Sequence, residues 1–315
     1  LPGEAMRLVN MMAHPYNEKY DLLTMQGRTN LFSFKNLYAL RYTDESGFEE
    51  YPTYSGLYYK LFKTDVYCGK GIIRTERLYN KLAEIFPSEK ILSHDVIEGS
   101  ILKTGSGGMC FEDAPENFIS DRERRKRWMR GDVQLLPFLF GLWKNDGKNR
   151  YKSDFSPVSR FIMAKNILST IKEACILSLL VIGLCVSPIL FGVAFGIFAL
   201  PYVINQVKII RSCVSGDKIS SILRKSAKNF FFAFEEFFLI GYYAVDNLIV
   251  LVTTLTRMAF GKNLLQWKTY YSSQKTRDFS SYVRLIALPT LAMTVITAVL
   301  MSVGINVRFI FILHF

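Results

Sequence analysis

The sequence predicts an α/β part over residues 1–143, followed over residues 144–315 by an α-helical membrane region. In the first part, short apolar and aromatic runs alternate with charged segments of helical period, a pattern typical of mixed strands and helices. In the second part, no charged residue occurs between Ala174 and Val207 or between Leu285 and Val307. One membrane-spanning helix needs about 20 apolar residues, so each stretch is long enough to cross a bilayer.

The charge balance of the chain limits its partners. Lys and Arg number 39 against 27 Asp and Glu, which gives a formal net charge of +12, and 50% of the residues are hydrophobic. A basic, apolar chain binds either nucleic acid or anionic lipid, and the long apolar runs favour lipid, so no nucleic-acid partner is expected. The cysteines are odd in number and lack Cys-x-x-Cys spacing, so neither a disulfide framework nor a zinc site is predicted. They are Cys68, Cys110, Cys175, Cys185 and Cys213.

The N-terminal segments predict short elements. Apolar residues at helical spacing predict a helix over residues 5–12 that ends before His14. Residues 31–34 and 37–40 are predicted as short strands. The acidic, turn-rich stretch at residues 44–52 is predicted as a loop.

Two glycines then enclose a lysine. Gly69-Lys70-Gly71 suggests backbone that approaches a ligand closely, with a short strand after it. The spacing of a Walker phosphate loop is absent, and an ordinary turn is the simpler interpretation of these three residues alone. Thr75 is predicted to cap a helix over residues 75–85.

A carboxylate is predicted at a helix start in the central stretch, residues 91–137. Ser93 is predicted as the N-cap of a helix over residues 95–101. Asp95 then lies in the first turn, where backbone N–H groups favour its ionised form. The contiguous Ser93-His94-Asp95 does not indicate a hydrolase triad, because such triads are assembled from distant segments.

An acidic pair follows a segment rich in glycine and serine. Residues 103–109 are predicted as a loop that leads into a short strand at residues 109–111. Glu112 and Asp113 end that strand. The pair is interpreted as a contact either for an acceptor substrate or for a neighbouring loop.

A cationic cluster with one tryptophan closes the central stretch. Residues 121–134 predict a charged helix, and a basic run is usually a solvated helical face. This run, however, contains Trp128 and leads directly into the apolar residues 135–139. Arginines bind phosphate, aromatic faces bind sugar rings and a carboxylate takes a proton from a hydroxyl, so the stretch suits a sugar attached to a diphosphate. The cations are Arg124, Arg125, Lys126, Arg127 and Arg130.

Basic residues flank the first long apolar stretch on both sides. They place both ends of residues 174–207 in the cytosol and favour a hairpin that turns near Pro188. Residues 230–254 contain three acidic residues among apolar ones, which fits an amphipathic interfacial helix better than a span. Residues 285–307 are predicted as a further span.

Several spaced motifs occur in one order along the chain, and together they resemble the glycosyltransferase domain of cyclic β-1,2-glucan synthases, glycosyltransferase family 84. The domain is more distantly similar to processive family 2 synthases such as cellulose synthase, which carry Gln where Arg124 stands here. The motifs are Ala13-His14-Pro15-x-Asn17, Gly69-Lys70-Gly71-Ile72, residues 91–99, Arg124-x-x-Arg127-Trp128-x-Arg130-Gly131-Asp132-x-Gln134, Ser159-Arg160-x-x-Met163-x-x-Asn166 and Arg257-x5-Asn263-Leu264-Leu265-x-Trp267.

The resemblance implies that residues 1–143 are the C-terminal half of a GT-A domain that extends a β-1,2-glucan from UDP-glucose with inversion. Asp95 would be the general base on the acceptor hydroxyl. The residues expected to bind the donor and its diphosphate are Gly69, Lys70, Arg124, Arg127, Trp128 and Arg130. Those expected to bind the acceptor are Glu112, Asp113 and Trp128.

The resemblance also implies partners outside the chain. In the family, an Asp-x-Asp motif for Mg²⁺ or Mn²⁺ lies directly before the position of Leu1, so the metal ligands are expected upstream and none within this chain. A phosphorylase-like module is expected downstream. The isolated chain is therefore expected not to transfer glucose. The expected location is the bacterial inner membrane, with several spans, bound lipid and a cytosolic catalytic domain.

Other interpretations stay open at this stage. A family 2-like synthase of another β-glycan would share the same donor-side residues. A membrane scaffold without catalysis is a second alternative, against which the intact Asp95, Arg127 and Trp128 argue. A transporter is a third, but the chain has few spans and a large soluble part that carries the motifs.

Overall fold

The computed structural model describes residues 2–29, 38–39, 60–62, 66–82, 90–92, 94–141, 155–212, 214, 216–266 and 279–302. These residues fall into two compact units. The described parts of Leu1–Ile167 and Thr253–Arg277 form the first unit, and those of Leu168–Val252 and Asp278–Phe315 form the second. The boundary expected between residues 143 and 144 separates a transferase part from a membrane region rather than two compact units, and it stays a prediction.

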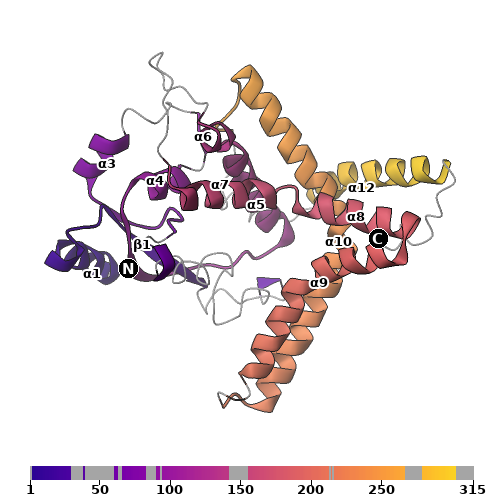
Figure 1. Ribbon diagram of the computed structural model, residues 1–315, viewed down its shortest axis with the longest axis horizontal. Helices are drawn as coiled ribbons and strands as arrows, with labels where there is room; N and C mark the ends of the chain where they lie inside the picture. Colours follow the sequence, from indigo (N-terminus) through magenta and orange to yellow (C-terminus); the bar gives the residue numbers. More distant parts are fainter. Residues whose placement is uncertain are drawn as a thin grey trace. The chain divides into compact units, whose positions relative to one another are not determined.

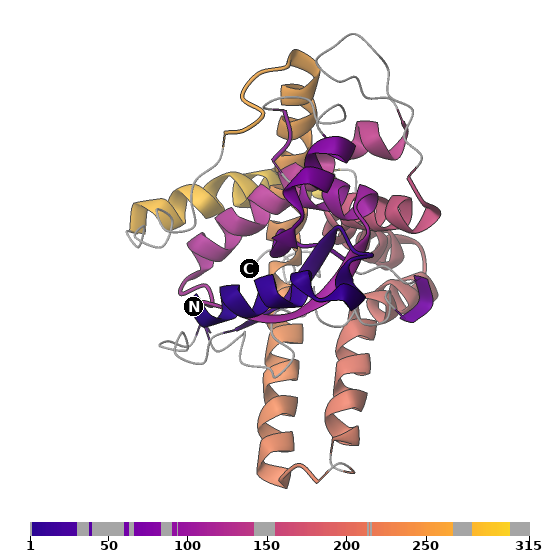
Figure 2. The ribbon, with the colours of Figure 1, turned by 90° about the vertical axis from the view of Figure 1, so that its left-hand side faces the viewer.

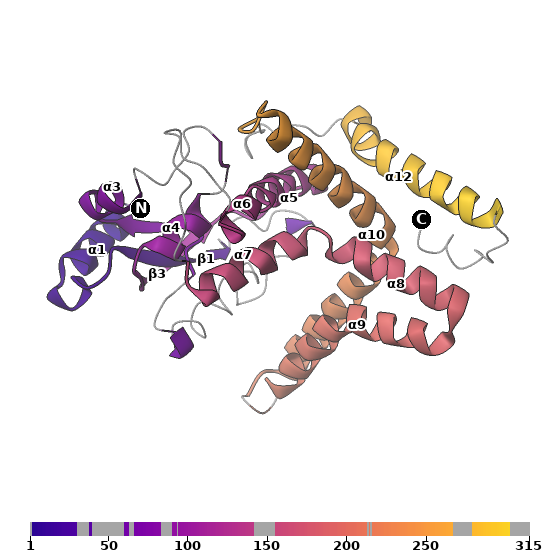
Figure 3. The same ribbon diagram turned by 45° about the horizontal axis from the view of Figure 1, so that its top comes forward.

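The first unit contains a three-stranded mixed sheet in the order β2-β1-β3. The central strand is β1 (Leu22–Thr29), which lies antiparallel to β2 (Gly71–Ile73) and parallel to β3 (Thr104–Glu112), as Figure 3 shows for β1 and β3. The expected α/β character of this part and the short strand expected after Gly69-Lys70-Gly71 are thereby confirmed. The elements expected at residues 31–34, 37–40 and 44–52 lie outside the described residues, apart from positions 38 and 39.

The prediction of a loop at residues 103–109 is wrong, because β3 already begins at Thr104. The register between β1 and β3 shifts after Thr24, which pairs with Ser106, whereas Met25 pairs with Gly108. A Cβ on the intervening Gly107 would lie 3.0 Å from the Thr24 carbonyl oxygen. Glycine in a strand often marks a bulge or a close backbone approach. Residues 103–109 therefore have a composition typical of loops although most of them form a strand.

Neighbouring leucines of β1 face opposite sides of the sheet, as the pleat of a strand requires. Leu23 packs with Met12 of α1 (Pro2–Ala13), which confirms the helix expected at residues 5–12. Leu22 belongs to the main core, together with residues from the helices on the other side. These helices are α3 (Thr75–Leu82), α4 (Asp95–Ile101), α6 (Leu136–Leu139) and α7 (Pro157–Ser169) (Figure 1).

The cationic cluster lies on α5 (Phe118–Val133), which confirms the helix expected there. The helix begins after Asn117, whose side-chain oxygen accepts a hydrogen bond from the Ser120 N–H at 2.8 Å. Such a cap satisfies one of the backbone donors that a helix start leaves unpaired. Asp121 and Arg122 are buried, so one face of this charged helix is turned into the protein.

The described residues of the second unit form mainly helices. These are α8 (Lys172–Val186), α9 (Pro188–Arg211), the part of α10 (Ile219–Phe260) up to Val252, and α12 (Phe279–Ser302). The chain breaks at Ser187, whose side chain caps α9, and Leu180 of α8 shares a core with Phe198 of α9. A turn next to Pro188 is therefore confirmed.

Three of the described helices, α9, α10 and α12, are long and apolar enough to cross a membrane, and the bent pair of α7 and α8 is a fourth candidate. Residues 230–254, expected to lie at the membrane interface, are an inner part of the 42-residue helix α10. By length and composition α10 is a candidate span, and the interfacial placement of residues 230–254 stays a prediction.

Candidate functional site

The segment before β2 approaches the central strand closely. The Lys70 carbonyl oxygen accepts a hydrogen bond from the Met25 N–H at 2.8 Å, and a Cβ on Gly71 would lie 2.2 Å from the Leu23 carbonyl oxygen. Gly69 has φ of 78°, a backbone conformation that favours glycine. The two glycines are therefore explained by backbone geometry, because they allow the segment that contains Lys70 to lie close to β1.

Lys70 forms an ion pair with Glu112, the last residue of β3. The two side chains meet over Gly27 of β1, where a Cβ would lie 2.7 Å from Glu112 Oε1 and 3.3 Å from Lys70 Nζ. Burial lowers the pKa of Lys70, since removal from water disfavours the charged form. Two residues that the sequence assigned to different substrates therefore contact each other.

Asp95 is the first residue of α4 and lies beside Gly69. A Cβ on Gly69 would be 3.4 Å from Asp95 Oδ2. Burial raises the pKa of Asp95, although a hydrogen bond from its own backbone N–H and the charge of His94 oppose the change. The expected position in the first helical turn is confirmed, whereas the N-cap position belongs to His94, and Ser93 lies outside the described residues.

The ring of His94 contacts Glu98. His94 Nδ1 lies 2.8 Å from Glu98 Oε1, one helical turn further on. The hydrogen bond to Glu98 raises the pKa of His94. His94 thereby supplies partial positive charge next to Asp95, a role that the sequence pattern alone did not indicate.

Asp121 anchors two arginines of α5. Its carboxylate accepts hydrogen bonds from Arg124 Nη2 at 3.1 Å, from Arg125 Nε at 3.3 Å and from the Tyr38 hydroxyl at 2.8 Å. The Arg124 guanidinium also lies 4.8 Å from the centre of the Trp128 ring, within the range of a cation–π contact. Arg124 and Trp128 are therefore held in one arrangement.

The charge of Arg124, on α5, also acts on Lys70. Burial affects the pKa of Lys70 most, followed by the nearby Cys68 and Cys110. The positive charge of Arg124 also lowers this pKa. Asp95, which lies beside Gly69, and Glu112 and Arg124, which lie near Lys70, thus belong to one neighbourhood. Cys68, whose pKa burial raises to about 11, lies in the same neighbourhood.

For three further predicted site residues, the structure describes other surroundings. Asp113 follows β3 and is exposed, and Arg127 is half-buried on α5. Arg130 donates a hydrogen bond to the Gln266 carbonyl oxygen at 3.2 Å, in the segment after α10. Their assigned roles stay predictions.

Gln134 is a site residue to which the sequence assigned no role. Its Oε1 accepts a hydrogen bond from the Leu92 N–H at 2.7 Å, and its Nε2 donates one to the Leu264 carbonyl oxygen at 3.0 Å. The side chain is 4% exposed. The only signal in the sequence is its place at the end of the cationic motif, where it joins two backbone segments far apart in the chain.

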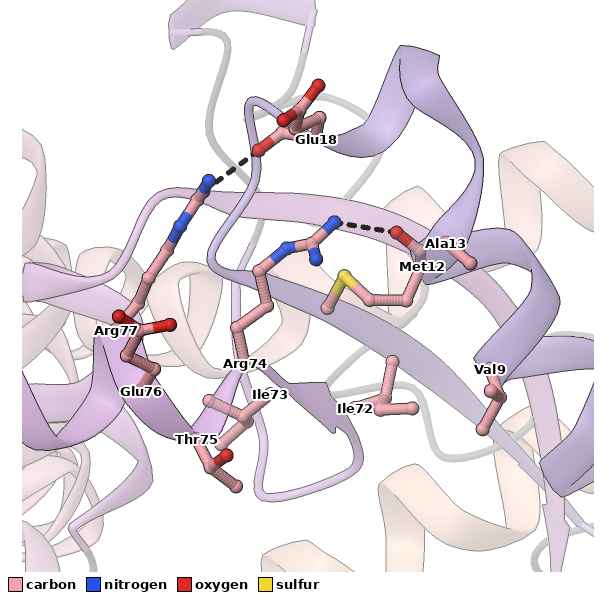
Figure 4. Close-up of a pocket in the computed structure, with 10 residues that line it drawn as sticks. All are labelled: Val9, Met12, Ala13, Glu18, Ile72, Ile73, Arg74, Thr75, Glu76 and Arg77. Carbon is pink, nitrogen blue, oxygen red and sulfur yellow. Dashed lines mark hydrogen bonds between the residues drawn. The ribbon is translucent and has the colours of Figure 1, made fainter.

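A separate pocket of about 480 Å³ lies between α1, the short helix η1 (Pro15–Asn17), β2 and the start of α3 (Figure 4). Arg74 donates a hydrogen bond to the Met12 carbonyl oxygen at 2.6 Å, and Arg77 donates one to the Glu18 carbonyl oxygen at 2.8 Å. None of the predicted site residues lines this pocket. Both arginines serve the fold here, so the pocket gives no support to a second binding site.

No group of three or more His, Cys, Asp and Glu side chains within the described ranges is placed to hold a metal ion. The carboxylates near Lys70 are Asp95 and Glu112, and the second of these is paired with the lysine. These residues do not fit a Mg²⁺ or Mn²⁺ centre, which needs several oxygen ligands around one point.

No protein-family model matches the chain. The chain is 27% identical over 151 residues to the cyclic beta-(1,2)-glucan synthase NdvB of Rhizobium meliloti (strain 1021). The match covers 42% of this chain and 5% of that protein, so the chain spans a small part of its relative. This chain is thus similar to a segment of a cyclic β-(1,2)-glucan synthase, in agreement with the resemblance that its spaced motifs carry.

Proposed function

We propose that this chain is part of a membrane-associated glucosyltransferase that extends a β-1,2-glucan from UDP-glucose. The observation that carries the proposal is the position of Asp95 beside Gly69, in the neighbourhood that also holds Lys70 and Arg124. A proton acceptor next to cations is what transfer from a sugar diphosphate requires. The similarity to the cyclic β-(1,2)-glucan synthase supports the sugar and the linkage.

In the proposed reaction, the acceptor hydroxyl oxygen forms a bond to C1 of glucose while the bond from C1 to the UDP oxygen breaks. The hydroxyl proton moves to Asp95, and UDP leaves with the bonding electrons. The cations Lys70 and Arg124 stabilise the negative charge that develops on the diphosphate. Trp128, with Arg124 against its ring, offers a face on which an acceptor sugar stacks.

The proposed reaction also includes a divalent cation on the diphosphate. Its chemistry would be to neutralise charge on the leaving group. The described residues offer no cluster of ligands for it, so its carboxylates would come from outside them. The cytosolic side of a bacterial inner membrane is the proposed location, and the three candidate spans support attachment to a membrane.

The test uses membranes that contain the full-length protein with this chain, incubated with UDP-[¹⁴C]glucose. Methylation analysis of the labelled product should give 2-linked glucose. Asp95→Asn should lower kcat by about 10²–10⁴, the usual contribution of a general base, with little change in KM for UDP-glucose. The matched control is Glu76→Gln, which removes the same charge from an exposed position outside the predicted site.

Three results would contradict the proposal. Labelled product with another linkage would indicate a synthase of a different β-glycan. Normal turnover by Asp95→Asn together with inactive Asp113→Asn would move the base to Asp113. A folded protein that binds neither UDP nor UDP-glucose would favour a scaffold without catalysis.

A further inference from the structure

The end of α9 and the start of α10 form a helical hairpin whose two arms lie side by side (Figures 1 and 2). Polar side chains join the arms. Asn205 donates a hydrogen bond to the side chain of Asn229 at 2.9 Å, and Gln206 donates one to the Ser226 hydroxyl at 2.7 Å. Asn229, which is 6% exposed, also donates to the Tyr202 carbonyl oxygen at 3.0 Å. The register of the two helices is therefore fixed as far as Gln206 and Ser226.

Residues 208–228, here called the hairpin tip, carry an excess of positive charge. Asp217 is the one acidic residue of this range in the sequence, and it pairs with Lys225 at 2.9 Å. Lys228 lies 5.5 Å from the centre of the Phe232 ring. The remaining four cations are exposed and have no ion-pair partner among the residues that the structure describes. They are Lys208, Arg211, Lys218 and Arg224.

Apolar side chains are exposed between and beside these cations. Val214 at the turn is 92% exposed, and Leu223 between the cations of α10 is 65% exposed. Further along the two arms the exposed side chains are apolar, and both helices are candidate membrane spans. They are Val203, Ile204 and Val207 on α9, and Phe230, Phe231 and Phe234 on α10.

This arrangement matches the boundary between headgroups and acyl chains. A solvated arm would leave a large apolar surface in water, which is unfavourable at about 25 cal/mol per Å². A nucleic-acid surface would satisfy the cations but would leave the aliphatic and phenyl groups beside them uncovered. A bilayer that contains anionic lipid satisfies both, because acyl chains cover the apolar arms while headgroup phosphates meet the lysines and arginines.

We propose that the hairpin tip binds the headgroups of anionic phospholipids through Lys208, Arg211, Lys218 and Arg224. The binding is independent of the glucosyltransferase chemistry, because all four residues belong to the second unit. It selects lipids by charge, so a zwitterionic headgroup is a poorer ligand than phosphatidylglycerol. Each cation near an anionic surface contributes modestly, and the four act together.

The test measures which lipid the purified, immobilised 315-residue chain retains from mixed micelles with equal amounts of phosphatidylglycerol and phosphatidylcholine. Bound lipids are extracted and quantified by mass spectrometry. The unaltered chain should be enriched in phosphatidylglycerol. The variant Lys208→Gln, Arg211→Gln, Lys218→Gln, Arg224→Gln should lose that enrichment by about tenfold or more. The matched control, Lys60→Gln, Lys90→Gln, Lys103→Gln, Lys262→Gln, removes the same charge from exposed positions of the first unit and should keep it.

Two further measurements keep the proposal falsifiable if the fourfold variant fails to fold. Exchange of Lys for Arg and Arg for Lys at the same four positions preserves charge and should preserve the enrichment. Salt added to the unaltered chain should reduce it, because the Debye length falls from about 10 Å at 0.1 M to about 3 Å at 1 M.

Several outcomes would overturn the proposal. One is equal retention of both lipids by the unaltered chain, and another is full enrichment in a folded fourfold variant. A third is equal loss in the control, which would show that overall charge acts rather than the tip. A fourth is a fourfold variant that no longer binds a single-stranded oligonucleotide but retains the lipids as the unaltered chain does. That result would identify nucleic acid as the partner.

Discussion

Gln134 joins the backbone that leads into Asp95 to the segment that follows α10, because its side-chain oxygen accepts the Leu92 N–H at 2.7 Å and its nitrogen donates to the Leu264 carbonyl at 3.0 Å. Leu92 lies three positions before the candidate base. A buried amide with both ends satisfied fixes two otherwise independent segments.

We expect Gln134→Leu to lower the free energy of unfolding by about 1–3 kcal/mol, because two partly buried backbone groups lose their partner. Hydrogen exchange should show faster exchange of the Leu92 amide. Gln134→Glu is the matched control, since its carboxyl keeps an acceptor and, when protonated, also a donor. Its stability deficit should shrink as the pH is lowered. A fully stable Gln134→Leu would show that the two hydrogen bonds contribute nothing.

The pKa of Asp95 gives two opposite expectations for one substitution. Burial raises this pKa above its usual 3.8, so the folded protein holds the proton more tightly than the unfolded chain does. Ionisation of this carboxyl therefore costs stability, by an amount that grows as the pH rises above 3.8 and is complete once the pH exceeds the raised pKa. Asp95→Asn should unfold at a higher temperature than the unaltered protein at pH 7, and the difference should vanish below pH 3.8.

Ionisation of Asp95, which lowers stability, should instead raise the rate of catalysis. A base must be ionised, so turnover should fall as the pH falls through the raised pKa of Asp95. The measurement is the pH profile of kcat for glucose transfer by the full-length protein. An acid limb that persists unchanged in the residual activity of Asp95→Asn would assign the titration to another group.

The ion pair between Lys70 and Glu112 makes a prediction about diphosphate binding. Glu112 competes with a diphosphate for the lysine, so Glu112→Gln should tighten UDP binding by about threefold to tenfold. Lys70→Gln should weaken it by a similar factor. Calorimetric titration with UDP measures both, and Asp113→Asn is the control of equal charge. Weaker binding by Glu112→Gln would instead mean that Glu112 positions Lys70 for the ligand.

Gly71 tests the approach of the Lys70 segment to β1. In Gly71→Ala the new Cβ would fall 2.2 Å from the Leu23 carbonyl oxygen, which forces β1 and β2 apart. We expect a loss of about 1–3 kcal/mol in the free energy of unfolding, as for overpacking elsewhere. Gly196→Ala, with open space around the new methyl, should cost nothing. Equal stability of both variants in chemical denaturation would contradict the close approach.

Local patterns in the sequence were sufficient for several elements. The helical periods at residues 5–12 and 121–134 correspond to α1 and α5, and the break before Pro188 separates α8 from α9. Each of these signals depends on neighbouring residues alone, through side-chain period or the missing N–H of proline. The placement of Asp95 in a first helical turn is of the same kind.

Contacts between distant segments decided the rest. The glycines of residues 105–108 read as a loop, yet pairing with β1 makes them a strand, because only the partner strand shows that close approach is needed there. The pairing of Lys70 with Glu112 and the bridge made by Gln134 join residues 42 or more positions apart. A sequence pattern carries the charge and shape of each side chain. Which partner satisfies a buried donor or charge is fixed only when the sheet and α5 bring those groups within hydrogen-bond distance.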